Sequence, residues 1–214
     1  AASSAASSAQ ATASSANSTA SSAASTANAA KDKVDNISVG GRNYAPNSTC
    51  NLGTTKYWSF VKIDGTYLGQ NVVSNANTTG WGNLKIDSIA SAATLKGQKC
   101  VMSAWVKATG TDGTYPTLRA DNQGQGQIIL TPVYDGAWHY IAKEFTMFDD
   151  WSSTLNLILR VNNTSESVSI SQFKLELGTL PTSWTPAPED VDSAITAAAN
   201  AAVKDIDVMY ALGT

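Results

Sequence analysis

Aromatic residues are confined to the middle of this 214-residue chain, and no other feature constrains the fold as strongly. All six Trp lie between Trp58 and Trp184, and the first aromatic residue of the chain is Tyr44. From Glu189 to the end there is a single aromatic residue, Tyr210. Because large apolar side chains supply most of the area that a core buries, we expect one core-forming domain of about 150 residues between two Ala-rich ends.

The first thirty residues consist only of Ala, Ser, Thr, Asn and Gln and carry no charge. Apolar residues recur here at alternating spacings of four and three, a heptad pattern typical of coiled coils. They are Ala2, Ala6, Ala9, Ala13, Ala16, Ala20, Ala23, Ala27, Ala30, Val34 and Ile37. Ala buries little area and Ser and Thr are moderate helix formers, so an isolated helix would be marginal and association is expected. We assign residues 1–38 to a helical coiled-coil segment, with a flexible Ser/Ala linker as the alternative.

A second helix is expected at residues 189–214, after a stretch that contains three prolines. Acidic residues occupy its first turn, where the positive end of the helix dipole favours them. Its apolar residues again follow spacings of four and three, and they are Ile195, Ala199, Ala202, Ile206 and Met209. We assign this segment to a C-terminal coiled-coil helix that links to whatever follows.

Residues 39–188 show short alternating runs separated by Gly, Asp and Asn. In 99–107, the side chains of Cys100, Met102, Ala104 and Val106 would share one face, and 155–161 alternates in the same way. The run 128–133 is expected to form a hairpin through Asp135-Gly136 with 138–145, and 168–177 supplies a last strand. This spacing predicts an antiparallel β-sandwich or jelly roll. Cys50 and Cys100 are interpreted as two buried thiols, with a disulfide as the alternative.

Charge and hydropathy exclude several classes of function. A formal net charge of −3 and a pI near 5.0 argue against a nucleic-acid partner, which normally meets a basic face. No apolar run approaches the ~18 residues that span a bilayer. The N-terminus lacks the basic start and apolar core of a signal peptide. We therefore expect neither nucleic-acid binding nor membrane insertion, and synthesis in the cytoplasm.

The sequence offers little for catalysis. The single histidine, His139, is interpreted as a partly buried strand residue. No phosphate-binding loop or dinucleotide fingerprint occurs, so no cofactor is expected. Asp149 and Asp150 are adjacent and would point to opposite faces of a strand, which disfavours a paired-carboxylate site. Enzyme activity is the weaker hypothesis, and no metal site is assigned.

Binding is the alternative chemistry, because sugars present apolar C–H faces that stack on aromatic rings beside polar groups. Ligand sites are concave, with a few directed polar side chains. Candidate residues are aromatics in loop-like contexts and polar residues that would face outward from strands, with packing at the ends of the sandwich as the alternative role. They are Trp81, Tyr115, Arg119, Asp121, Tyr134, Trp151 and Arg160. Trp105 and Trp138 are attributed to packing.

Four stretches resemble one known family. They are GRNYAPNST at 41–49, SAWVKA at 103–108, WHYIAKEFT at 138–146 and KLELGTLPTSWTPAPED at 174–190. They are similar to carbohydrate-binding modules in tail-tip and baseplate proteins of phages that infect Gram-positive, notably lactic acid, bacteria. The ending VMYALGT is also similar to the start of the Tyr-rich segment that follows such modules.

The resemblance implies a galactose-binding-like jelly roll that adheres, without catalysis, to host cell-wall polysaccharide as part of a virion tail. Helical segments would make a homotrimer, and other tail or baseplate proteins would be partners. Some related modules hold a structural calcium ion, but no acidic cluster here is clear enough to assign one. A purely structural tail spacer is the main alternative, and a glycan hydrolase is a third.

Overall fold

The computed structural model divides the chain into two compact units, Ala1–Ile37 and Ser38–Thr214. The residues that the structure describes are 2–76, 79–86, 89–110, 117–121, 126–149, 155–161 and 165–212.

The first unit is one long helix, α1 (Ala2–Asp35), as the heptad pattern predicted. Residues 3–37 are all exposed, so the apolar seam is not covered within this unit. The hydroxyls of Ser7, Thr12 and Thr26 each donate to the carbonyl four residues earlier, at 3.0–3.1 Å. Such bonds slightly destabilise a helix. The coiled coil itself stays a prediction.

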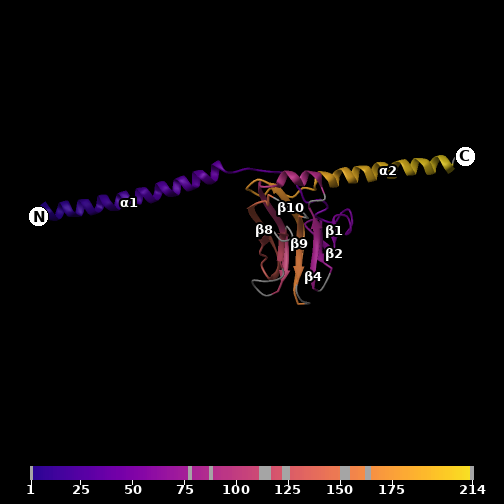
Figure 1. The fold of residues 1–214 in the computed structure, drawn as a ribbon, viewed down its shortest axis with the longest axis horizontal. Helices are drawn as coiled ribbons and strands as arrows, with labels where there is room; N and C mark the ends of the chain where they lie inside the picture. The colour runs from indigo at the N-terminus through magenta and orange to yellow at the C-terminus, as the bar shows by residue number, and fades with distance from the viewer. Residues whose placement is uncertain are drawn as a thin grey trace. The chain divides into compact units, whose positions relative to one another are not determined.

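The second unit is mainly β, and its described residues form two five-stranded antiparallel sheets, as predicted (Figure 1). The first sheet has the order β1-β4-β9-β6-β7, with β1 (Trp58–Ser59), β4 (Gly80–Lys85), β9 (Asn156–Val161), β6 (Thr117–Asp121) and β7 (Gln127–Leu130). The second has the order β2-β3-β10-β5-β8, with β2 (Val61–Tyr67), β3 (Gln70–Asn75), β10 (Ser167–Leu177), β5 (Lys99–Thr109) and β8 (Asp135–Thr146). A short 3-10 helix, η1 (Ala90–Leu95), and the helix α2 (Pro188–Leu212) complete the unit.

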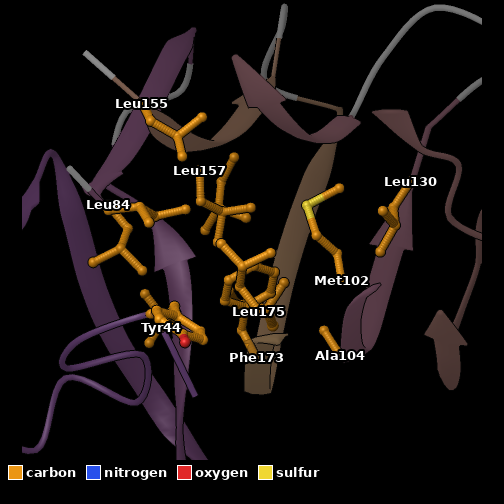
Figure 2. Close-up of a cluster of buried hydrophobic side chains, with 14 of the residues drawn as sticks. Tyr44, Leu84, Met102, Ala104, Leu130, Leu155, Leu157, Phe173 and Leu175 are labelled. Atoms are coloured by element: carbon orange, nitrogen blue, oxygen red, sulfur yellow. The ribbon is translucent and has the colours of Figure 1, made fainter. Parts of the chain in front are cut away.

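The core lies between the two sheets. Figure 2 shows Met102 of β5, Leu157 of β9 and Phe173 of β10 gathered among other buried side chains. The alternation predicted for 99–107 and 155–161 is confirmed, because both apolar faces are buried in this core. Cys50 and Cys100 are free and buried, and burial raises the pKa of each thiol to about 12.

The hairpin expected at Asp135-Gly136 is wrong. Strands β7 and β8 belong to different sheets, and residues 131–134 carry the chain from one sheet to the other. Asp135 and Gly136 begin β8, which pairs with β5 along nearly its whole length. A two-residue turn signal is local, and this long ladder against a central strand overrides it.

The stretch 41–49, which carries part of the family resemblance, is largely buried and has a structural role. The buried Asn43 side chain donates to the carbonyls of Phe173 (3.3 Å) and Thr185 (3.0 Å), and it accepts from the amides of Ala45 (2.9 Å) and Leu175 (3.2 Å). A side-chain amide that is satisfied on all sides in this way ties neighbouring segments together without leaving a buried polar atom unpaired.

The start of α2 is fastened to the β unit by polar contacts. Both carboxylate oxygens of Asp190 lie 2.8 Å from the amide of Asn47, and Arg42 donates to Glu189 at 2.5 Å. Lys56 also donates to Ser193, at 2.9 Å. The first turn of α2 is therefore part of this unit rather than a loose tail.

Candidate functional site

The outer face of the second sheet is partly covered by residues 178–187, which we call the strap. Beneath it, Lys174 and Glu176 of β10 are at most 1% exposed, and their Nζ and Oε2 atoms are 3.3 Å apart. Lys174 also donates to the Thr182 hydroxyl (2.5 Å) and the Ser183 carbonyl (2.9 Å). Glu176 accepts from the amide and hydroxyl of Thr182, at 2.7 and 2.6 Å. Because each buried charge has several partners, the pair fixes the strap to the sheet.

Beyond the strap, the same face carries four aromatic residues in mutual contact. Trp105 of β5 lies opposite Tyr140 of β8, with ring centroids 5.6 Å apart. Tyr67, at the end of β2, meets Trp105 edge-on at 5.5 Å and stacks on Trp138 at 4.3 Å with an interplanar angle of 14°. All four are at least partly exposed. Contacts of this kind hold rings in fixed orientations.

Two clefts of about 420 Å³ each lie on this face, and each is lined by one of the Trp residues that the Tyr67 ring contacts. The strap cleft lies between the strap and the sheet, and it is lined by Trp105, Tyr140 and Trp184 together with polar residues that include Gln172. The other cleft, which we call the hairpin cleft, is lined by Trp138, Lys107, Asp64 and small polar residues of β10. Both volumes fall in the range of small-ligand sites.

The strap cleft is the more aromatic of the two. Its three rings come from β5, β8 and the strap, which are far apart in sequence. Trp184 is held from behind, because its Nε1 donates to the Ser48 hydroxyl (3.3 Å) and the Phe173 carbonyl (3.2 Å). Its indole is therefore oriented by the domain and still forms one wall of the cleft.

Two of the residues predicted from sequence come together elsewhere. Trp81 of β4 and Arg160 of β9 are register partners in the first sheet, and the Arg160 guanidinium carbon lies 5.6 Å from the Trp81 ring centroid. The loop expected at Trp81 is wrong, because Trp81 lies on β4 and pairs with β9, and its side chain is 47% exposed. This cation–π pair therefore lies on the other sheet from the two clefts.

The remaining predicted residues lie on a neighbouring strand, in a crossover between the sheets, or outside the described residues. Tyr134 is half-buried in the crossover between β7 and β8. Arg119 and Asp121 lie on β6, in register with Ile158 and Asn156 of β9. Tyr115 and Trp151 lie outside the described residues.

Sequence reasoning missed the aromatic side chains of the two clefts. Trp105 and Trp138 were attributed to packing, although the alternation of 99–107 already set Trp105 opposite the core-facing residues. The alternation of Trp138 with His139 along β8 carries the same signal, since Trp138 and Tyr140 share a face. Tyr67 had no local signal, because its position depends on where the β2–β3 hairpin lies.

The polar residues considered for catalysis form no grouping typical of an active site among the described residues. His139 is half-buried on β8, as expected, with its Nε2 atom 3.0 Å from each carboxylate oxygen of Asp135. The hydrogen bond from the Ala137 amide and, after it, the His139 contact hold the pKa of Asp135 below its usual value. Asp150 lies outside the described residues. Among the residues described, no three His, Cys, Asp or Glu side chains are grouped to hold a metal ion.

Among the described residues, no helix has an apolar stretch long enough to cross a membrane. No protein-family model matches the chain, and no curated protein matches it in sequence.

Several solved structures resemble the chain in outline. A family 16 carbohydrate-binding module is 19% identical with a TM-score of 0.47, covering 62% of this chain and 99% of its own. A xylan-binding domain from Paenibacillus barcinonensis is 18% identical with a TM-score of 0.41, covering 65% and 94%. The tripod from the baseplate of bacteriophage Tuc2009 is 19% identical with a TM-score of 0.46, covering 72% and 61%. Similarities at this level do not carry a function from one protein to another.

Proposed function

We propose that the strap cleft binds a saccharide and that the chain is a non-catalytic adhesion module for cell-wall polysaccharide. The observation that carries the proposal is the convergence of Trp105, Tyr140 and Trp184 on one cleft. Pyranose rings have apolar faces that stack on aromatic rings, and their hydroxyls need polar partners. Gln172 and the strap's hydroxyl residues supply such partners in the same cleft.

The rings are held before any ligand arrives. Trp184 is oriented by two hydrogen bonds, and Trp105 and Tyr140 are in contact with each other. A preformed site avoids the entropy cost of ordering side chains on binding. It remains open to solvent, which suits recognition of a polymer rather than the enclosure of a reacting group.

The strap residues of the cleft belong to the sequence stretch with the most specific resemblance to phage tail modules. That resemblance supports a virion tail as the location, a bacterial host of the Gram-positive class, and other tail or baseplate proteins as partners. The resembling stretch, 174–190, covers the whole strap and also contains the ion pair of Lys174 and Glu176 beneath it.

The helix α1 supports self-association, and the family resemblance suggests that the assembly is a homotrimer. Its apolar seam is exposed along 34 residues, and a helix of this composition gains stability by burying that seam against copies of itself. Several modules on one bundle would then bind a polymer together, and effective concentration would offset a weak single-site affinity. Sedimentation of the full chain, compared with that of residues 38–214, tests this. If both samples sediment as monomers at high concentration, the association is contradicted.

The binding proposal is tested with fluorescently labelled full-length chain on purified Gram-positive cell walls and on a glycan array. Trp105→Ala and Trp184→Ala should each weaken binding by about tenfold or more, as expected for aromatic residues that a bound ligand would cover. Trp81→Ala is the matched control, since it removes an exposed Trp from the other sheet. If no saccharide or wall is bound, the proposal is wrong and the spacer function stands in its place.

Two further outcomes would redirect the assignment. If Trp81→Ala loses binding while Trp105→Ala keeps it, the site is the Trp81–Arg160 face of the first sheet. Release of soluble sugar from the polysaccharide, abolished by one carboxylate substitution, would make the protein a glycan hydrolase.

A further inference from the structure

The tip of the β2–β3 hairpin lies against the outer face of the second sheet. The chain turns at Leu68 and Gly69, which both have positive φ angles, 48° and 76°. This turn type matches the twist of a two-residue hairpin. Strand β3 pairs with β10 at Ser74–Ser169 and Val73–Ile170, and β10 then bulges between Ser171 and Lys174.

Polar contacts fix the hairpin tip at this bulge. The buried Ser171 hydroxyl lies 3.3 Å from the carbonyls of Tyr67 and Asn71. The side-chain amide of Gln172 donates to the Leu68 carbonyl at 3.2 Å. The backbone of Tyr67 is therefore anchored to the central strand β10, although β2 itself is an edge strand.

From this anchor, the Tyr67 ring reaches one aromatic residue of each cleft. It meets Trp105, which lines the strap cleft, and it stacks on Trp138, which lines the hairpin cleft. The stacking is close to parallel, so one face of the Trp138 indole is already occupied. A sugar ring cannot stack on that face while Tyr67 remains there.

Resting on the proposed function, we infer that Tyr67 is a specificity-determining residue that closes the strap cleft on the side away from the strap. The cleft is then bounded at both ends, by the strap and by the Tyr67 ring. A ligand that fits is a short unit, such as the non-reducing end or a side branch of a polysaccharide. The middle of a long linear chain would have to cross Tyr67 to reach the hairpin cleft.

The test uses the polysaccharide that the full-length chain binds on the array, cut by partial acid hydrolysis into an oligosaccharide ladder. Affinity for each length is measured by isothermal titration calorimetry. For the wild type, affinity should stop rising at about three sugar units, one for each ring of the strap cleft. A continued rise with longer oligosaccharides would overturn the inference and leave the proposed function intact.

Substitutions of Tyr67 and its stacking partner Trp138 give a second test with the same oligosaccharides. Tyr67→Ala should join the clefts and move the plateau to longer oligosaccharides, whereas Tyr67→Phe keeps the ring and should leave it in place. Trp138→Ala removes the stacking partner and should shift the plateau in the same direction as Tyr67→Ala. If Tyr67→Ala folds, judged by an unchanged circular dichroism spectrum, and leaves the plateau where it was, Tyr67 is not the boundary. Failure of the wild type to bind any array glycan would instead refute the proposed function.

Discussion

Replacing Lys174 by Met removes the cation that faces Glu176 beneath the strap. Both side chains are at most 1% exposed, so the carboxylate left behind is shielded from water. Breaking a buried ion pair from one side costs about 3–5 kcal/mol, because the remaining charge loses its compensation. For a unit of this size, that loss corresponds to a drop in Tm of roughly 6–20 °C.

The assay is urea unfolding of the full-length chain, followed by Trp fluorescence. Lys62→Met is the matched control, because Lys62 and Asp64 are also 3.3 Å apart but are each 55% exposed. This control should change the free energy of unfolding by less than about 1 kcal/mol. Raising the salt concentration should weaken the exposed pair and leave the buried one unchanged.

The strap should loosen along with the pair. Lys174 donates to Thr182 and Ser183, so its loss also removes contacts that hold the strap. Lys174→Met is therefore expected to weaken saccharide binding as well as stability. If it costs no more stability than Lys62→Met, the conclusion that this pair fixes the strap is refuted.

Three further predictions concern titration, thiol access and backbone space. Burial raises the pKa of Asp190 above its usual value, so the folded state binds this proton more tightly than the unfolded state does. The contribution of Asp190 to the free energy of unfolding therefore falls as the pH rises, and wild type should lose stability relative to Asp190→Asn between pH 3 and 7 in urea titrations. The two buried thiols, with pKa values of about 12, should not react with Ellman's reagent at pH 8 until urea is added. Gly178→Ala should lower the free energy of unfolding by about 2 kcal/mol more than Gly53→Ala does. Both glycines have positive φ, but only a Cβ at 178 would meet the Ser38 carbonyl oxygen, at 2.4 Å, and equal losses in thermal melts would contradict this close approach.

Local sequence patterns were enough to predict the secondary-structure elements and which face of each lies in the core. Both helices and the core faces of 99–107 and 155–161 follow from residue periodicity, which depends only on the geometry of a helix or strand. The error at Asp135-Gly136 shows where this stops. A turn signal reflects only the preference of two residues. Strand β8 instead pairs with β5, a strand distant in sequence, and local preferences do not encode that choice.

The candidate site divides in the same way. Periodicity by itself determined that Trp105 faces away from the core and that Arg160 faces outward. Trp81 was expected in a loop, and only the strand pairing of β4 with β9 brings it beside Arg160. Only the tertiary structure decided that Trp184 faces Trp105 across a cleft and that Tyr67 divides the face. These contacts join an edge hairpin, a central strand and a strap held by a buried ion pair, and no local sequence preference encodes contacts between segments so far apart.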